Sequence, residues 1–328
     1  MNTRRLVDPA LLPVLDVFPT IALSMELLVP MREGERFAQL PVKVLDEVRQ
    51  SVLQAVRSVP GPAGAPDITL TIYTPRNATG PLPCIYHIHG GGYVGGAAAQ
   101  LEPLHRPAAF DLNCVIVSVD YRLAPEHPFP AGIEDCYAGL AWTFANASEL
   151  GIDRNRVGVM GESAGGGLAA ALTLLARDRG EYKLTFQHLI YPMLDDRTCV
   201  AAEPNPVAGE FIWTAHNNRF GWTSLLGHEP GRPDVSPYAA AARATDLCGL
   251  PPAFIACPTL DLFIDEDIAY AARLARAGVA VELYVYPGGF HGFDIFGGDA
   301  PISVRARAHS REALRRALNF STNDLSDS

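Results

Sequence analysis

The chain has 328 residues with 26 basic and 36 acidic side chains, so its formal net charge at pH 7 is −10. That length can bury a full hydrophobic core, in one large α/β domain or in two average domains. Apolar residues make up 48% and charged residues 19%, a balance that excludes an intrinsically disordered chain. The acidic charge argues against nucleic acid or an anionic membrane as a partner, because both require a basic surface.

The cysteines and the N-terminal residues bear on the compartment. Six cysteines lie far apart, and no two of them form a CxxC pair. This pattern indicates reduced, mostly buried thiols in a cytoplasmic protein rather than a disulfide framework or a zinc site. Arg4 and Arg5 precede an apolar stretch at Ala10–Pro30, but Asp16 and Glu26 interrupt it. We therefore expect neither a signal peptide nor a membrane-spanning segment.

The predicted elements become clear after a turn-like segment at Pro60–Asp67, whereas residues 45–58 carry both a helical and a strand pattern. Short apolar runs predict strands at Ile68–Tyr73, Cys84–His89, Cys114–Val119, Val157–Met160, Phe186–Tyr191, Phe254–Cys257 and Val281–Tyr286. Helical stretches alternate with several of them, at Gly132–Ser148, Ala164–Arg179, Asp265–Ala277 and Ile302–Leu318. The alternation predicts an α/β fold whose mostly parallel sheet is covered by helices on both faces.

The strongest chemical signal is Gly161-Glu162-Ser163-Ala164-Gly165, which follows a predicted strand and precedes an Ala/Leu-rich helix. A serine in so sharp a strand-to-helix turn has a strained backbone, and the residues two positions away on either side must be small. The N-terminus of the helix also directs free N–H groups at the site. The GxSxG pattern alone often arises by chance, but this context indicates that Ser163 is a nucleophile.

A serine nucleophile needs a base, and the base needs an acid that orients it. In this architecture the chain order is serine, acid, histidine, each in a loop at the carboxyl edge of the sheet. Of the five histidines after Ser163, only His291 follows a predicted strand in a glycine-rich loop, and the alternative is a surface histidine. Asp261 follows the strand at Phe254–Cys257, while Asp265 is expected to be the N-cap of the next helix. Asp261 is therefore the predicted acid.

The third predicted component is an oxyanion hole. The run His89-Gly90-Gly91-Gly92-Tyr93 leaves a predicted strand and fits the HGGG pattern, in which glycine lets backbone N–H groups approach a developing oxyanion. Gly91 and Gly92 are the expected donors, together with the N–H of Ala164 after the nucleophile.

Residues 90–95 also match the glycine fingerprint of dinucleotide-binding proteins, and Asp120 ends the next predicted strand 25 residues later. However, Pro103 and Pro107 are expected to interrupt the helix that such a motif must open. A dinucleotide site would also leave the order of serine, acid and histidine unexplained, so we favour the hydrolytic interpretation.

His87 and His89 place two imidazoles on one face of a predicted strand, as a metal site would. No carboxylate or further histidine lies at ligand spacing in the sequence, so a structural role is expected and no metal.

Together, HGGG at 89–92, Asp120–Glu126 (DYRLAPE) with Pro128–Ala131 (PFPA), and GESAGG at 161–166 resemble the hormone-sensitive-lipase family of α/β-hydrolases. The resemblance extends over roughly residues 50 to 318, and within the family the chain is most similar to bacterial acetyl esterases of the heroin-esterase type. The resemblance implies the α/β-hydrolase fold. It places the catalytic triad on Ser163, Asp261 and His291 and the oxyanion donors on Gly91, Gly92 and Ala164.

The resemblance further implies one domain over residues 1–328 with a small helical cap built from about 1–50 and about 195–228. The second of these segments breaks the alternation of strands and helices. It is expected to close a modest pocket lined by Tyr93, Phe211, Trp213 and Trp222. Family members dimerise through the last strand and helix, so a homodimer is expected.

Two positions depart from the family pattern. The acid motif reads Asp261-Leu262-Phe263-Ile264-Asp265 where Asp-Pro-Leu-x-Asp is usual. Glu162 stands before the nucleophile where aspartate is common, and we expect it to change the hydrogen bonding of the loop more than the mechanism.

The sequence thus predicts a cytoplasmic serine carboxylesterase that hydrolyses short-chain, acetyl-like esters of small molecules through an acyl-enzyme. It needs no cofactor and engages neither nucleic acid nor membrane. An amidase or lactonase with the same triad is the alternative among enzymes. A non-catalytic ligand receptor on the same fold is the alternative outside them, but plant receptors of this family lack the catalytic histidine, which His291 supplies here.

Overall fold

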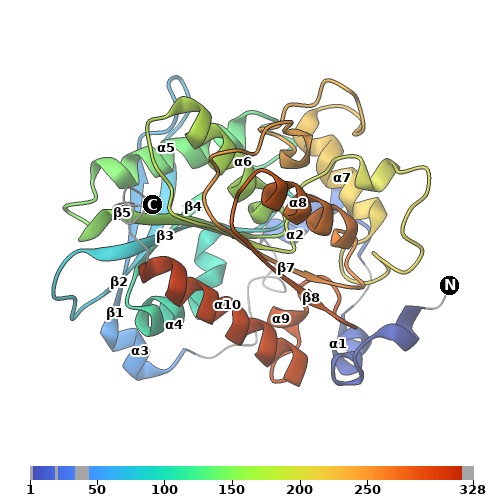
Figure 1. Ribbon diagram of the computed structural model, residues 1–328, viewed down its shortest axis with the longest axis horizontal. Coiled ribbons are helices and arrows are strands. Elements are labelled where there is room, and N and C mark those ends of the chain that lie inside the picture. The colour runs from blue at the N-terminus through green and yellow to red at the C-terminus, as the bar shows by residue number, and fades with distance from the viewer. Residues whose placement is uncertain (1–2, 19–20, 34–43, 320–328) are drawn as a thin grey trace.

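An eight-stranded sheet forms the centre of the molecule in a computed structural model that describes residues 3–18, 21–33 and 44–319 (Figure 1). The strands run across the sheet in the order β1-β2-β4-β3-β5-β6-β7-β8. β2 pairs antiparallel with β1 and with β4, and the other pairs are parallel. The mostly parallel sheet confirms the predicted fold class. The strands are β1 (Val52–Val59), β2 (Ile68–Pro75), β3 (Leu82–Ile88), β4 (Val115–Asp120), β5 (Ile152–Glu162), β6 (Gln187–Ile190), β7 (Ala253–Pro258) and β8 (Val281–Tyr286).

Helices cover both faces of this sheet. In Figure 1, α5, α6 and α8 lie above the sheet, and α3, α4 and α10 lie below it. The α-helices are α1 (Leu12–Val17), α2 (Met25–Glu33), α3 (Asp46–Ser51), α4 (Glu102–Leu112), α5 (Ala131–Ala145), α6 (Ala164–Arg179), α7 (Ala215–Leu226), α8 (Ile264–Arg276), α9 (Phe293–Phe296) and α10 (Pro301–Asn319). Short 3₁₀ turns are η1 (Thr3–Leu6), η2 (Pro9–Leu11), η4 (Ala98–Leu101), η5 (Thr198–Val200) and η6 (Ala241–Arg243).

Burial along the strands follows from this layering. The central strands β3 and β7 are buried at every position, because helices cover both of their faces. The edge strands β1 and β8 keep several exposed side chains. The carboxyl ends of β3, β5, β6, β7 and β8 meet at one edge of the sheet, where loops of an α/β protein place their chemistry.

The structure decides one open pattern and corrects one expectation, both for local reasons. The mixed pattern at residues 45–58 is a helix, α3, followed directly by the strand β1. Helix α4 forms although it contains Pro103 and Pro107, so the expected interruption was wrong. Pro103 stands in the first turn, where its missing N–H costs no helical hydrogen bond.

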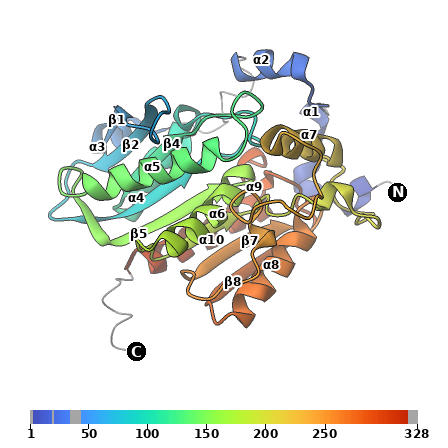
Figure 2. The same cartoon turned by 90° about the horizontal axis from the view of Figure 1, so that it is seen from above.

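The N-terminal segment and the insertion after β6 meet above the sheet edge. The N–H of Leu23 donates to Oδ1 of Asn217 in α7 at 2.9 Å, and Nδ2 of Asn217 donates to the carbonyl of Ile21 at 2.8 Å. Helix α3, by contrast, packs against β1 and α4, on the opposite side of the molecule from α7 (Figure 2). Of the predicted cap, residues 21–33 therefore lie near the insertion and residues 46–51 do not, while 34–43 lie outside the described residues.

Among the helices in the described part of the chain, none combines the length and the apolar character that crossing a bilayer requires.

Candidate active site

The turn between β5 and α6 holds Ser163 in a strained conformation, with φ 56° and ψ −123°. Glycine is required on both sides of it. A Cβ on Gly161 would lie 2.3 Å from the carbonyl oxygen of Gly165, and a Cβ on Gly165 would lie 2.1 Å from the carbonyl oxygen of Ile88. The structure therefore has the predicted strand–turn–helix arrangement, for the steric reason that the sequence suggested.

Ser163, His291 and Asp261 form one chain of hydrogen bonds. Nε2 of His291 lies 2.9 Å from Oγ of Ser163, and Nδ1 of His291 lies 2.7 Å from Oδ2 of Asp261. All three side chains are buried. Because a carboxylate only accepts, Nδ1 carries the proton, and the lone pair of Nε2 faces the serine hydroxyl. This arrangement can remove the hydroxyl proton as the serine attacks a carbonyl carbon.

Asp261 and Asp265, the two candidate acids that follow β7, lie in different environments. Helix α8 begins at Ile264 with Phe263 as its N-cap, so the expected N-cap role of Asp265 was wrong. Asp265 lies in the first turn, is exposed, and accepts hydrogen bonds from Nδ2 of Asn205. Asp261 holds the turn itself, because its Oδ1 accepts the N–H of Phe263 at 3.1 Å. One oxygen of Asp261 thus fixes the loop and the other holds the imidazole.

The glycine-rich loop after β3 offers unpaired donors beside the serine. Gly91 has φ +119° and Gly92 has φ +62°, values that favour glycine. The carbonyl of Gly91 accepts the N–H groups of Val94 and Gly95. Within the described residues, the backbone N–H groups of Gly91, Gly92 and Ala164 have no hydrogen-bond acceptor. Three free N–H donors near a nucleophile suit the stabilisation of an oxyanion.

A cavity of about 290 Å³ opens over Ser163 and His291. Its wall combines the sheet edge with the N-terminal segment and the insertion, through Ile21, Leu23, Met31, Ile212, Trp213 and Asn217. The indole of Trp213 lies against Gly92, because a Cβ there would be 2.2 Å from its ring carbon Cη2. The prediction that Trp213 lines the pocket agrees with this geometry.

Three other aromatic residues expected in the pocket do not line this cavity, so that part of the prediction was wrong. Tyr93 turns inward at φ +66° and donates its hydroxyl hydrogen bond to the carbonyl of Met193 at 2.9 Å. Trp222 is fully buried, and its ring centroid lies 5.2 Å from that of Tyr93. Phe211 packs against Phe290, with 6.2 Å between the two ring centroids. Their large apolar surfaces contribute to the core instead.

Sequence reasoning missed a buried polar cluster behind the nucleophile. Nε2 of His87 lies 2.8 Å from Oε2 of Glu162, and Nδ1 of His87 lies 2.9 Å from Oγ of Ser118 and 3.1 Å from Nε2 of His105. Burial lowers the pKa of His87 to about 3 and raises the pKa of Glu162 to about 7. His105 lies in α4, and no local sequence pattern predicts its contact with His87 of β3. In the ranges described, no group of three or more His, Cys, Asp and Glu side chains could hold a metal ion.

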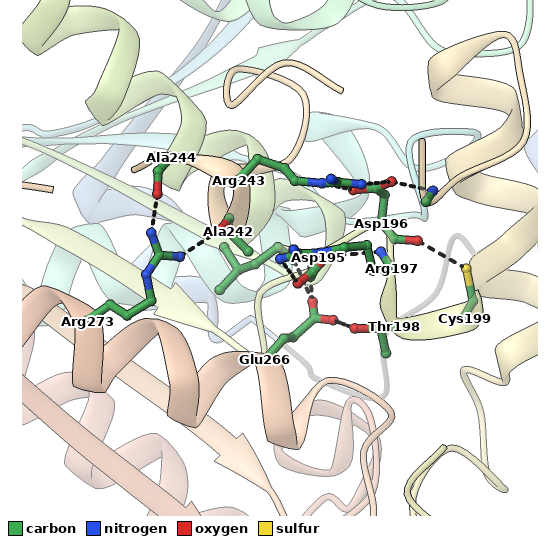
Figure 3. Close-up of polar contacts among 12 residues, drawn as sticks. Asp195, Asp196, Arg197, Thr198, Cys199, Ala242, Arg243, Ala244, Glu266 and Arg273 are labelled. Atoms are coloured by element: carbon green, nitrogen blue, oxygen red, sulfur yellow. Dashed lines mark hydrogen bonds and ion pairs between the residues drawn. The ribbon is translucent and has the colours of Figure 1, made fainter. Parts of the chain in front are cut away.

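The start of the insertion is fixed to the body of the protein by two buried carboxylates (Figure 3). Asp196 accepts from Nε and Nη2 of Arg243 at 2.8 and 2.9 Å, and from the N–H of Gly231. Glu266 of α8 accepts from the N–H groups of Leu194 and Asp195 and from the hydroxyl of Thr198. The insertion therefore begins on a rigid base.

The cysteines agree with the sequence interpretation. All six are free thiols, and Cys84, Cys114, Cys136 and Cys257 are buried. The fold therefore has no disulfide bond.

Comparison with known proteins gives a consistent result. Residues 85–295 match the sequence model of a family described as having the alpha/beta hydrolase fold. Carboxylesterase NlhH of Mycobacterium tuberculosis is 37% identical over 322 residues, covering 95% of this chain and 97% of the relative. Esterase LipI of Mycobacterium tuberculosis is 34% identical, covering 95% and 96%. The solved structure titled "Bacterial Heroin Esterase" superposes with a TM-score of 0.86 at 38% identity, covering 97% of this chain and 100% of that one.

Proposed function

Because the chain belongs to the α/β-hydrolase family, in the hormone-sensitive-lipase branch that contains these carboxylesterases, we propose that this carboxylic ester hydrolase acts through Ser163, His291 and Asp261. The observation that carries the proposal is the continuous hydrogen-bonded chain from the serine hydroxyl through the imidazole to the buried carboxylate.

The proposed reaction follows from this geometry. Nε2 of His291 takes the proton of Ser163 as its Oγ bonds to the ester carbonyl carbon. The carbonyl oxygen becomes an oxyanion that accepts from the N–H groups of Gly91, Gly92 and Ala164. His291 then returns the proton to the leaving alcohol, and an acyl-enzyme remains. Water, deprotonated by the same imidazole, releases the acid and restores the serine.

We further propose that the substrates are esters with short acyl chains of roughly two to six carbons, closed in by the cap. The cavity over Ser163 holds about 290 Å³, and Trp213 and Met31 limit it. The cap of this proposal consists of the N-terminal segment and residues 195–228. A single methylene changes discrimination by only about 1–3 kcal/mol, so the optimum will be broad.

A series of 4-nitrophenyl esters from acetate to palmitate, with one 4-nitroanilide, tests both parts of the proposal. We expect the highest kcat/KM between two and six carbons, little hydrolysis of the anilide, and loss of turnover in Ser163→Ala. Ser148→Ala, an exposed serine, is the matched control and should behave as wild type. Faster turnover of emulsified long-chain triglyceride than of soluble butyrate esters would reject the acyl preference, and faster cleavage of the anilide would favour an amidase.

The cellular setting and assembly are also part of the proposal. The six free thiols support a cytoplasmic enzyme. The edge strand β8 exposes Leu283 and Val285, which supports a homodimer formed through this strand and α10. Cell fractionation and sedimentation of the purified chain test the two statements. Recovery outside the cytoplasm, or a monomer at micromolar concentration, would contradict them.

A further inference from the structure

The catalytic cavity carries acidic character without a basic counterpart. Among the described residues that line it, the titratable side chains are those of His89, Glu162, Tyr191 and His291, and none is Lys or Arg. Burial lowers the pKa of His89 and raises that of Tyr191, so both are neutral near pH 7. His291 must be neutral to act as a base. Among the described residues that line the cavity, Glu162 is therefore the group that can place a charge there before a substrate binds.

The partner of Glu162 does not cancel its charge. Oε2 of Glu162 faces Nε2 of His87, whose other nitrogen faces Ser118 and His105. Since a carboxylate only accepts, Nε2 of His87 is the donor, and in the neutral imidazole Nδ1 is then the acceptor. The pKa of His87, lowered to about 3 by burial, agrees. Glu162 is thus held by a dipole and keeps a net negative charge when ionised.

The other groups around Glu162 leave this charge uncompensated as well. His105 of α4 is neutral, because burial lowers its pKa. Asp294 of α9 is a second carboxyl, and burial together with the charge of Glu162 raises its pKa to about 6. On α10, Arg307 donates to the carbonyls of Asp294 and Gly298, and Arg311 pairs with Asp111. Neither guanidinium is bonded to Glu162.

The cavity also has the aromatic lining that cations favour. Tyr191, Trp213 and Phe296 border it, and aromatic faces attract an ammonium group, most strongly when it is desolvated. The side chain of Glu162 keeps 13% of its surface exposed, so it is not sealed away from the cavities that it lines. The net charge of −10 acts in the same direction at long range.

We propose that Glu162 is a specificity-determining residue that makes the site select esters bearing a quaternary ammonium group over neutral esters of the same shape, and reject esters bearing a carboxylate. The inference rests on the proposed ester hydrolysis at Ser163 and names its substrate class.

The experiment compares kcat/KM for acetylcholine and for 3,3-dimethylbutyl acetate, which differ in charge and hardly in shape. At pH 8.5 we expect a preference of about tenfold for the cation, the size produced by unit charges about 10 Å apart at an effective dielectric constant of about 20. The preference should shrink at pH 6, because the raised pKa of Glu162, about 7, leaves the carboxyl protonated there. A change with pH in the fraction of active enzyme scales both rates alike and leaves their ratio unchanged. Monoethyl succinate should be the poorer substrate beside diethyl succinate.

In Glu162→Gln the preference should fall to within about twofold at both pH values. Asp299→Asn is the matched control, since it removes one exposed carboxylate that lies outside the catalytic cavity, and it should keep the full preference. A wild-type ratio near one with the neutral ester hydrolysed, or a Glu162→Gln variant that keeps the ratio, would overturn the inference and leave the proposed function intact.

A binding measurement separates the inference from turnover and from the folding of the variant. Choline should bind to the wild-type protein about tenfold more tightly than 3,3-dimethylbutanol at pH 8.5, and the difference should shrink at pH 6. Equal affinities would overturn the inference. Failure to hydrolyse any of the neutral esters would instead count against the proposed function.

Discussion

Two regions of the molecule bury a carboxylate completely and place it against a different kind of partner. At the sheet edge, Asp261 faces Nδ1 of His291, a group that gains a proton on its other nitrogen during the proposed reaction. At the base of the insertion, Asp196 faces the guanidinium of Arg243, a cation that only donates hydrogen bonds. Both carboxylates are 0% exposed.

Because these two equally buried carboxylates have such different partners, burial alone does not identify a catalytic acid. A buried carboxylate has a chemical role when its partner can accept a proton and is itself hydrogen-bonded to a nucleophile. A permanently charged partner with further backbone donors, such as the N–H of Gly231 on Asp196, assigns a structural role. The two sites should therefore respond oppositely to the same substitution.

Asp261→Asn is expected to have the largest effect, a loss of about 10⁴ in kcat, because the amide favours the wrong imidazole tautomer. Its folding should change little, since the amide oxygen can still accept the N–H of Phe263. Steady-state kinetics and a melting curve on the same sample check this. A variant with more than a tenth of wild-type kcat would remove Asp261 from the proposed triad.

Asp196→Asn should lower the stability of the fold and leave catalysis unchanged. Removing one partner of a buried ion pair typically costs about 3–5 kcal/mol of unfolding free energy, because the guanidinium of Arg243 is left without its counter-charge. Urea unfolding should show this loss, while kcat per folded molecule stays close to wild type. A stable variant that has lost kcat would show that the base of the insertion takes part in the chemistry.

Buried histidines whose pKa is lowered in the folded protein predict sensitivity to acid. Burial lowers the pKa of His188 to about 3, and its Nε2 lies 2.8 Å from the hydroxyl oxygen of Ser310. Burial lowers the pKa of His87 to a similar value. Both stay neutral in the folded protein while the unfolded chain takes up protons below about pH 6.5. The contribution of each of these histidines to stability should therefore fall as pH decreases from 6.5 toward 3, by up to about 1.4 kcal/mol per pH unit. Buried carboxyls with a raised pKa, such as Glu162 and Asp294, act in the opposite direction, so the effect of one histidine is seen by comparing the wild type with a variant that lacks it. Denaturant midpoints of the wild type and of His188→Asn, measured between pH 7 and pH 4.5, test this for His188. The stability of the wild type relative to the variant should fall toward pH 4.5, and a difference that does not change with pH would contradict the prediction.

Asp265→Ala should have the smallest effect. Phe263, not Asp265, is the N-cap of α8, and among the described residues the exposed carboxylate of Asp265 bonds only to the half-buried side chain of Asn205. We expect a change within about 0.5 kcal/mol in unfolding free energy and an unchanged kcat. An inactive but folded Asp265→Ala beside an active Asp261→Asn would reverse the assignment of the acid.

The parts of the site that the sequence predicted are those fixed by local sterics and chain order. The glycines at 161 and 165 are dictated by contacts within a single turn, and the loops after β7 and β8 follow from the alternation of strands and helices. The errors concern contacts between distant segments. Trp213 faces the cavity and Trp222 is buried in the core. Which of the two tryptophans faces the cavity depends on how the insertion packs, and the composition of the insertion does not predict this.

The same limit applies to the cluster around Glu162. His105 of α4 contacts His87 of β3 across the fold, and no sequence pattern near either residue predicts that contact. The one signal was Glu162 itself, as a departure from the residue that is common before the nucleophile. The start of α8 at Ile264 rather than Asp265 is a shift of one residue, which propensities do not resolve.

Covalent labelling tests the central claim, that Ser163 is the nucleophile, most directly. The protein is incubated with a 4-nitrophenyl alkylphosphonate, and the adduct is located by intact mass and peptide mapping. We expect one equivalent of adduct on Ser163 with complete loss of esterase activity, the same labelling in Ser148→Ala, and none in a folded Ser163→Ala. Labelling of another residue with loss of activity, or an esterase that stays fully active after Ser163 is modified, would contradict the account.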